Sequence, residues 1–210
     1  MSVDIIFEDH RMLVLNKPAG MSVHNPKAGD SLNDFVQEHL KQEKLYPAHR
    51  LDKETSGLII YAKSSKWASV IQTLIADRLV EKKYIGIFKG EIEPDEGVWK
   101  WALTNKPEGR GKPQGWVKFR KKAVTEWIKL RGNEYFTELK LQIITGRQHQ
   151  IRKHASLAKH HLVGDPRYTQ PDYNEKVAEI YNFNRMALHA CSLKFQIEDE
   201  TLEFEAPKPE

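Results

Sequence analysis

Short apolar runs and two amphipathic stretches organise the first third of the chain. Strands are predicted at Val3–Phe7, Met12–Asn16 and Gly57–Ala62. The last of these runs is apolar throughout, which is typical of a buried strand. Two other segments carry apolar side chains at helical spacing. One helix is expected from a cap at Ser31 to about Lys41, and another follows a cap at Ser64 or Ser65.

The later part of the chain is richer in strand signals. Strands are predicted at Lys83–Gly90 and Val98–Leu103, and hairpins at Ala123–Leu130 with Phe136–Ile144 and at Leu188–Ile197 with Thr201–Glu205. A helix is expected at Gln148–Ala158, a mobile loop at Lys106–Gly115, and a mostly irregular stretch at Pro166–Asn184. This order of elements predicts one α+β domain over residues 1–210, with a mixed, mainly antiparallel sheet flanked by helices. Two lobes on one sheet would fit the same pattern.

Length and composition exclude several classes of protein. A chain of 210 residues is long enough to form a stable hydrophobic core without disulfide bonds or structural metal ions. No apolar run approaches the roughly 20 residues of a membrane span, and the acidic start does not resemble a signal peptide. The single cysteine, Cys191, excludes an intramolecular disulfide framework and a Cys-rich zinc site. A cytoplasmic location is therefore expected.

The charges are distributed unevenly, although the net charge is only +4. Nine Lys or Arg residues lie between Lys106 and Arg131, against two acids. Between Arg147 and Arg167 there are five Lys or Arg residues, four histidines and one acid, Asp165, whereas six acids oppose one lysine between Gln196 and Glu210. Such asymmetry fits a polyanion partner held on one face. A solvated surface explains it equally well.

The string HRLDKETSGL places one carboxylate beside a buried strand. Asp52 lies between Arg50 and Lys53, and these cations favour its ionised form. An ionised carboxylate can act as a nucleophile or a base. A loop aspartate can also cap a turn through its own backbone, which is the commoner role.

The string TGRQHQIRKH follows strand signals and enters a predicted helix. Gln148 and Arg152 are four residues apart and share a helix face, so Arg152 is a candidate ion-pair partner for a distant carboxylate. A basic helix face in water is the simpler interpretation. His149 and His154 are five residues apart, which does not fit a helical metal site.

Aromatic residues offer a third kind of candidate chemistry. Tyr84, behind two lysines, could stack on a base, although a core or edge-strand tyrosine is commoner. The same holds for four tryptophans, to which no role is assigned because tryptophan usually fills the core: Trp99, Trp101, Trp116 and Trp127.

Together and in this order, six strings resemble the RluA-type pseudouridine synthases. They are KPAGMSVH (Lys17–His24), HRLDKETSGL (His49–Leu58), KKY (Lys82–Tyr84), TGRQHQIRKH (Thr145–His154), LVGDPRY (Leu162–Tyr168) and ALHACSLKF (Ala187–Phe195). The resemblance covers nearly the whole chain. It implies the pseudouridine synthase catalytic fold and the isomerisation of uridine to pseudouridine in ribosomal or transfer RNA, with the target base flipped out. It implies neither a cofactor nor a metal.

The resemblance also implies roles for single residues. Asp52 would be the catalytic carboxylate, Tyr84 would lie against the target base, and Arg152 would pair with Asp52. Arg50 would contact the RNA beside the extruded base. The other residues expected to bind the substrate are His49, Arg147, His149 and Gln150. Thr169 stands where the family usually has glycine after its GDxxY motif, so the geometry of that turn is open.

Two alternatives from other functional classes remain at this point. A catalytically silent RNA-binding protein of the same fold would not need Asp52, Tyr84 and Arg152 together. A nucleoside or glycoside hydrolase usually pairs two carboxylates, and the acid nearest to Asp52 in the sequence is Glu54. Many relatives carry an N-terminal S4 domain, which is not expected here because the sequence opens directly on the catalytic domain. RNA affinity is therefore expected from the domain's own basic surfaces, and a monomer is expected.

Overall fold

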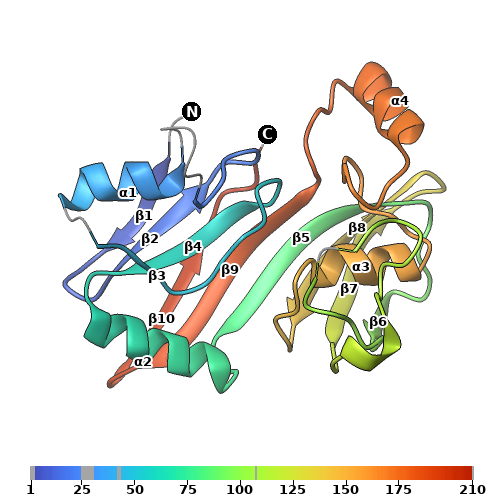
Figure 1. Cartoon of the computed structure of the whole chain (residues 1–210). Helices are drawn as coiled ribbons and strands as arrows, with labels where there is room; N and C mark the ends of the chain where they lie inside the picture. Colours follow the sequence, from blue (N-terminus) through green and yellow to red (C-terminus); the bar gives the residue numbers. More distant parts are fainter. Residues whose placement is uncertain (1–2, 25–30, 42–43, 107, 210) are drawn as a thin grey trace. The chain divides into compact units, whose positions relative to one another are not determined.

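The computed structural model describes residues 3–24, 31–41, 44–106 and 108–209, which divide into two compact units (Figure 1). The first unit comprises Met1–Lys82 and His189–Glu210, and the second comprises Lys83–Leu188. The first unit is therefore discontinuous in sequence. Each unit has its own strands and helices and is described separately.

The first unit is a mixed sheet with two helices. Its strands are β1 (Asp4–Glu8), β2 (Met12–Lys17), β3 (Tyr46–Pro47), β4 (Ser56–Ala62), β9 (Leu188–Ile197) and β10 (Glu200–Glu205), and its helices are α1 (Leu32–Leu40) and α2 (Ser65–Ala76). The strand order is β1-β2-β4-β9, with β3 paired to β4 and β10 paired to β9. Every pair is antiparallel except β4 with β9.

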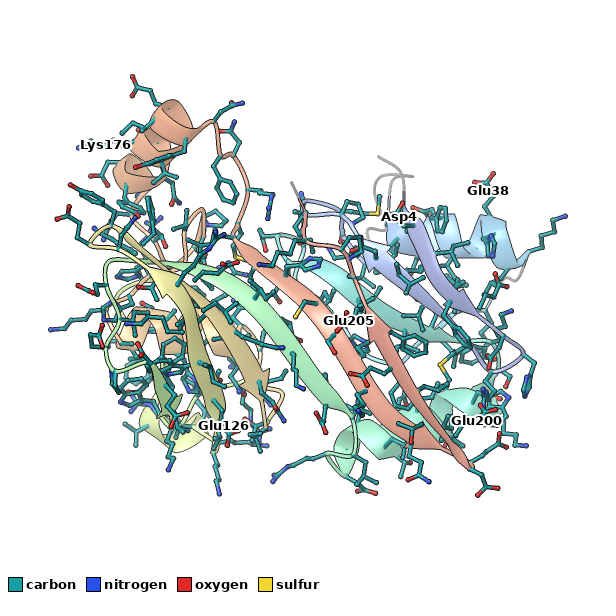
Figure 2. All side chains as sticks on the ribbon, turned by 180° about the vertical axis from the view of Figure 1, so that it is seen from behind. Asp4, Glu38, Glu126, Lys176, Glu200 and Glu205 are labelled. Carbon is teal, nitrogen blue, oxygen red and sulfur yellow. The ribbon has the colours of Figure 1, made fainter. Side chains whose placement is uncertain are left out.

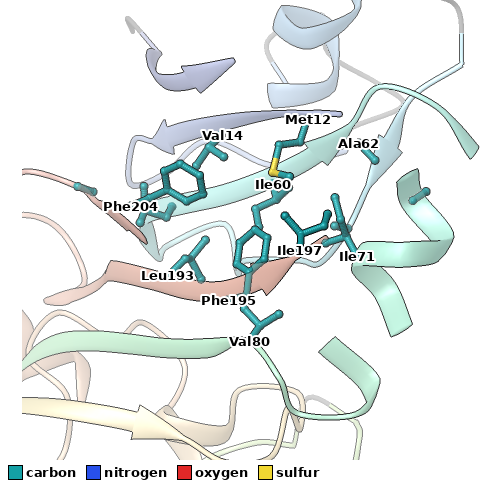
Figure 3. Close-up of a cluster of buried hydrophobic side chains, with 14 residues drawn as sticks. Met12, Val14, Ile60, Ala62, Ile71, Val80, Leu193, Phe195, Ile197 and Phe204 are labelled. Atoms are coloured by element: carbon teal, nitrogen blue, oxygen red, sulfur yellow. The ribbon is translucent and has the colours of Figure 1, made fainter. Parts of the chain in front are cut away.

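Apolar side chains from strands distant in the sequence form the core of this unit (Figure 3). Strand β4 is buried along its whole length, as its uninterrupted apolar run predicts. Ile60 of β4 contributes to the same cluster as Phe195 of β9 and Phe204 of β10. Helix α2 adds Ile71, so burial of its apolar stripe holds it to the sheet.

Both helices of the first unit begin at the predicted serine caps. The Ser31 hydroxyl accepts a hydrogen bond from the Asp34 amide, and the Asp34 carboxylate accepts one from the Ser31 amide, forming a capping box. The Ser64 hydroxyl accepts a hydrogen bond from the Trp67 amide at the start of α2. These local signals explain why the helix starts could be predicted from the sequence.

Strands β4 and β9 approach each other closely at Gly57. This residue has φ +109°, and a Cβ atom there would lie 2.2 Å from the Ala190 carbonyl oxygen. Beside this crossing, the buried hydroxyl of Ser56 is 2.9 Å from Nδ1 of His189. Ser56 and Gly57, from the string HRLDKETSGL, thus contact His189 and Ala190, which belong to the string ALHACSLKF.

Replacing Gly57 by alanine is expected to destabilise the protein by about 3 kcal/mol or more, because the methyl group meets rigid backbone at an unfavourable φ. Gly20→Ala is the matched control, since Gly20 has φ +83° but a Cβ there meets nothing within 4 Å. It is expected to cost only about 1 kcal/mol. Urea unfolding of both variants measures the difference. Equal losses would show that the close approach to Ala190 is not the cause.

The second unit is an antiparallel sheet with two α-helices. Its strands are β5 (Glu81–Lys89), β6 (Glu96–Trp99), β7 (Thr125–Gly132) and β8 (Phe136–Ile143), and its helices are α3 (Gln150–Leu157), α4 (Pro171–Tyr181) and the short 3-10 helix η1 (Val117–Phe119). The strand order is β5-β8-β7-β6. The indole of Trp99 lies 5.8 Å from the Phe88 ring and 5.9 Å from the Trp127 ring, measured between centroids, and all three residues are buried.

Two predictions for this unit were wrong. The stretch expected to be mostly irregular contains α4, which begins with Pro171 in its first turn and ends at Tyr181, followed by Asn182 in the left-handed conformation. Its buried Val177 and half-buried Tyr173 pack in a small cluster with Val163 and Ala187. The strand predicted to extend to Leu103 ends at Trp99, since Leu103 forms only an isolated bridge to Lys121.

The acidic stretch near the end of the chain lies largely on the last hairpin of the first unit. Figure 2 shows Glu200 and Glu205 at opposite ends of β10. The Arg11 guanidinium binds Glu200 at 2.7 Å and Glu198 at 3.3 Å. Lys194 binds Glu203 at 2.8 Å. Part of this negative charge is therefore used in ion pairs within the unit.

The predicted fold class is confirmed by this arrangement: the chain is α+β, with mainly antiparallel strands and flanking helices. Within the described ranges, none of the helices has the length and apolar character that crossing a bilayer requires.

Candidate active site

Asp52 lies in the loop that joins β3 to β4 in the first unit. Its backbone carbonyl accepts a hydrogen bond from the Thr55 amide at 3.1 Å, which closes a turn directly before β4. Thr55 is buried, whereas Asp52 is only half-buried. The turn therefore holds the carboxylate at the start of a buried strand but leaves it partly accessible.

A buried lysine fastens this loop to the end of β2. Lys17 Nζ donates to the carbonyl oxygens of Pro18 and Met21, each at 2.9 Å, and to that of Lys53 at 3.1 Å. The Lys53 carbonyl also accepts a hydrogen bond from the Gly20 amide at 2.9 Å. Two donors from the first family string thus fix the residue that follows Asp52.

The same lysine places a positive charge next to two acids. Burial lowers the pKa of Lys17 to about 8, although the charges of Glu54 and Asp52 act in the opposite direction. At neutral pH the side chain is still protonated and so offers three N–H donors. Lys17 therefore has a positioning role in this loop as well as an electrostatic one.

The two residues before Leu51 differ in their surroundings. The His49 ring accepts a hydrogen bond from the Ile60 amide through Nε2 at 3.3 Å, and burial, with a smaller effect of Lys82, lowers the pKa of His49 to about 3. His49 is therefore neutral and helps to hold the loop against β4. Arg50 is exposed. Of the two residues predicted to bind substrate here, Arg50 is thus the more accessible.

In the second unit, Gln150 lies buried at the start of α3, and its side-chain amide makes four hydrogen bonds. Its Oε1 accepts hydrogen bonds from the Thr145 hydroxyl at 2.7 Å and the Arg147 amide at 3.1 Å. Its Nε2 donates to the Val124 carbonyl at 2.9 Å and the Thr125 hydroxyl at 3.0 Å. These four contacts give Gln150 a structural role between the helix and β7.

His154 continues the same hydrogen-bond network one turn further along α3. It is fully buried, with Nδ1 2.9 Å from the Thr125 hydroxyl and Nε2 3.0 Å from the Trp101 carbonyl oxygen. The Trp101 carbonyl oxygen can only accept, so Nε2 carries the proton of the neutral ring and Nδ1 accepts a hydrogen bond from the Thr125 hydroxyl. Burial lowers the pKa of His154 to about 4, against a smaller opposing effect of the Trp101 carbonyl.

Acid is therefore expected to weaken the second unit through His154. Between pH 6.5 and 4 the unfolded chain binds a proton that the folded chain does not, so the free energy of unfolding falls as the pH falls through this window. From pH 7 to 5 the expected loss is about 2 kcal/mol. Urea unfolding of wild type and His154→Gln at both pH values isolates this loss. An unchanged difference between the two proteins would contradict it.

Arg152 forms a buried, bidentate ion pair within the second unit. Its Nε donates to Asp165 Oδ2 at 2.8 Å and its Nη2 to Oδ1 at 2.9 Å. Burial alone would raise the pKa of Asp165, but hydrogen bonding to Arg152 and to the amides of Arg167 and Tyr168 brings it below its usual value. The ionised carboxylate therefore holds the guanidinium in one orientation. A guanidinium has five N–H donors, and this pair uses two of them.

Tyr168, in the turn that carries Asp165, contacts both Arg152 and His149. The Tyr168 ring lies 5.5 Å below the Arg152 guanidinium, and its hydroxyl is 3.1 Å from Nδ1 of His149. Thr169 is accommodated without a positive φ, and its hydroxyl donates to the Leu162 carbonyl at 2.6 Å. Threonine at this position, where the family usually has glycine, therefore closes the turn with a hydrogen bond from its side chain.

The remaining predicted residues of the second unit lie on β5 and before α3. Tyr84 is buried near the start of β5, opposite Leu141 of β8. Arg147 is half-buried, and its Nε donates to the Lys122 carbonyl at 3.1 Å. The first unit thus contains Asp52, Arg50 and His49, and the second contains Tyr84, Arg147, His149, Gln150 and Arg152.

Sequence reasoning gave no role to several residues that shape these sites: Lys17, Asp165, Tyr168 and His154. Asp165 had a usable signal, because it is the single acid in the basic stretch from Arg147 to Arg167. Lys17 belongs to a family string, but nothing in the sequence indicates that its ammonium is buried. In the parts of the chain that the structure describes, no three His, Cys, Asp or Glu residues gather so as to hold a metal ion.

The likeness to known proteins agrees with the fold and the strings. Residues 11–157 match the family described as RNA pseudouridylate synthase. The chain is 30% identical over 93% of its length to tRNA pseudouridine synthase C of Vibrio parahaemolyticus, covering 85% of that protein. It is 34% identical over 99% of its length to ribosomal large subunit pseudouridine synthase D of Buchnera aphidicola, covering 70% of it. The solved human RNA pseudouridylate synthase domain containing 4 is 26% identical, with a TM-score of 0.80 over 98% of this chain and 88% of that one.

The chain belongs to the RNA pseudouridylate synthase family. Within this family its relatives are of the RluA type, as the six strings predict. The predicted class of enzyme, an isomerase that forms pseudouridine in RNA, is thereby confirmed.

Proposed function

We propose that this chain isomerises uridine to pseudouridine in ribosomal or transfer RNA, as a cytoplasmic monomer, with Asp52 as the catalytic carboxylate. The observation that carries this is the fixation of the Asp52 loop on both sides. Lys17 binds the carbonyl of Lys53, and beyond the turn the Ser56 hydroxyl contacts His189. A catalytic group must be held in place by its supporting residues, and here these are buried while the carboxylate is partly accessible.

The reaction exchanges one bond to C1′ for another, with no other substrate. The bond from N1 of uracil to C1′ of ribose breaks, the base turns, and C5 is joined to C1′. C5 loses its proton and N1 gains one, so the product is an isomer of uridine. Asp52 acts either by attacking the sugar or by taking a sugar proton, and both routes require it to be ionised. The target nucleotide is flipped out of its stack, at a cost of a few kcal/mol that RNA contacts offset.

The second unit would supply the groups that bind and orient. Tyr84 stacks on the uracil, and Arg152 pairs with Asp52 and keeps it charged. Asp165 supports this role, because it fixes the guanidinium through two hydrogen bonds. Arg50 occupies the space that the flipped base vacates. Arg147 and His149 contact the RNA beside it, with Gln150 and His49 acting mainly through the positions of their neighbours.

Release of tritium from RNA labelled at C5 of uridine tests the activity directly. Purified protein is incubated with ribosomal and transfer RNA from cells that lack it, and the modified positions are then mapped. Tritium in water together with pseudouridine in the RNA is expected. Free uracil as the product would instead support a hydrolase. RNA binding without tritium release would support a catalytically silent binding protein.

A further inference from the structure

An exposed aromatic pair lies within the most basic part of the second unit. The basic loop, defined here as residues 103–121 and described except for residue 107, includes η1 and the residues around it. Trp116 is 64% exposed and Phe119 is 48% exposed. Large aromatic side chains bury much apolar surface when they enter a core, so their clustering at the surface indicates a contact site.

Lysine side chains accompany both rings. Lys112 Nζ lies 4.6 Å from the centroid of the Trp116 ring. Lys106 and Lys118 Nζ lie 5.3 and 5.0 Å from the centroid of the Phe119 ring. Each ring therefore carries an ammonium group over it, and a stacking base would displace that group toward the phosphate that follows the base. Alternating aromatic and cationic groups are typical of surfaces that bind single-stranded nucleic acid.

The basic loop is held at its base while the rings point outward. Leu103 and Lys121 exchange two backbone hydrogen bonds, of 2.9 and 2.8 Å. Arg120 donates through Nε and Nη2 to the Gly115 carbonyl at 3.1 and 2.8 Å. The Gln114 amide donates to the Ala102 carbonyl at 3.2 Å. Such fixation presents the two rings in a defined place, which lowers the entropy lost on binding.

One buried cation and one exposed cation also tie the loop to the surroundings of Arg152. Lys153, fully buried and next to Arg152 on α3, donates to the carbonyl oxygens of Thr104 and Lys106. Arg110 Nε donates at 2.7 Å to the carbonyl of Thr169, in the turn that carries the Arg152 partner. The loop is therefore anchored to the two segments that hold the proposed catalytic arginine in place.

We propose that Trp116 and Phe119 form a stacking platform for unpaired bases of the RNA substrate that flank the target uridine. Lys106, Lys112 and Lys118 would bind the intervening phosphates. This inference rests on the proposed function, which identifies RNA as the partner. It adds a second RNA-binding surface to the proposed active site. RNA is favoured over a protein because the basic loop, residues 103–121, carries six Lys or Arg residues and one acid, Glu108.

The test is binding of a fluorescently labelled single-stranded oligouridine of about 12 nucleotides, followed by anisotropy. Trp116→Leu and Phe119→Leu remove one ring each, and each is expected to weaken binding about tenfold or more. Trp116→Phe keeps a ring and should stay within about threefold of wild type. Tyr181→Leu, which removes an exposed aromatic ring from α4, is the matched control and should bind as wild type does. Thermal unfolding confirms that the variants are folded.

Tritium release from RNA labelled at C5 separates this proposal from the proposed function. The leucine variants should raise KM for RNA and leave kcat unchanged, because the platform binds nucleotides that do not react. Folded leucine variants that bind the oligouridine within twofold of wild type would overturn the platform, and this is also the result if the surface serves a protein partner. If wild type releases no tritium but the leucine variants lose binding, the platform stands and the proposed function fails.

Discussion

Asp52→Asn is expected to abolish tritium release from C5-labelled RNA, lowering kcat by about 10³-fold or more. An amide is nearly the same size as a carboxylate but can neither attack the sugar nor accept its proton. Because Lys17 reaches the loop through the Lys53 carbonyl, the loop should keep its shape. The variant should therefore bind RNA and unfold much as wild type does.

Glu54→Gln is the matched control for this experiment. Glu54 lies two residues from Asp52 in the same loop, and its charge also acts on Lys17. Removing it alters the charge of the loop without touching the proposed catalytic group, so turnover should stay within a few-fold of wild type. Near-normal turnover of Asp52→Asn would exclude Asp52 from the chemistry. Equal losses in the two variants would point to the charge of the loop rather than to one carboxylate.

Asp165→Ala is expected to destabilise the protein by about 3–5 kcal/mol, because it leaves the Arg152 guanidinium buried without its carboxylate partner. Activity should be lost as well, since the same carboxylate orients the arginine. The single variant therefore mixes a structural effect with a functional one. Urea unfolding measures the first and tritium release the second.

Replacing both partners separates the two effects. Arg152→Met with Asp165→Leu removes the buried charges together, and such replacements are often close to neutral for stability. The double variant should regain most of the free energy of unfolding and yet remain inactive, if Arg152 acts on the carboxylate that performs the chemistry. Stability and activity that return together would give Arg152 a purely structural role.

The local elements of the fold could be predicted because their signals are local. Ser31 and Ser64 cap helices where expected, and β4 is buried as its apolar run indicates. Helix α4 was missed because polar residues dominate it. Its signals were nonetheless present in Pro171 at the start and in Tyr173 and Val177 one turn apart.

The candidate site was only partly predictable for a different reason. Asp52 and Arg152 stand out because the family resemblance implies a role for each. Asp165 also lies in a family string, LVGDPRY, but nothing in the sequence indicates that it pairs with Arg152, thirteen residues earlier in the chain. Buried Lys17 donates hydrogen bonds to three backbone carbonyl groups. Every residue has such a group, so the sequence does not indicate which of them the lysine contacts. Contacts of this kind are set by tertiary packing and become visible only in the folded structure.

The discontinuity of the first unit has a consequence for synthesis on the ribosome. All of the second unit has been translated once residue 188 is made, but the hydrophobic cluster of Figure 3 still lacks five of its fourteen buried residues, Leu193, Phe195, Ile197, Phe204 and Ala206. Domains generally fold as units as they leave the exit tunnel. The first unit can therefore complete this cluster only after the final hairpin, β9 and β10, has been translated.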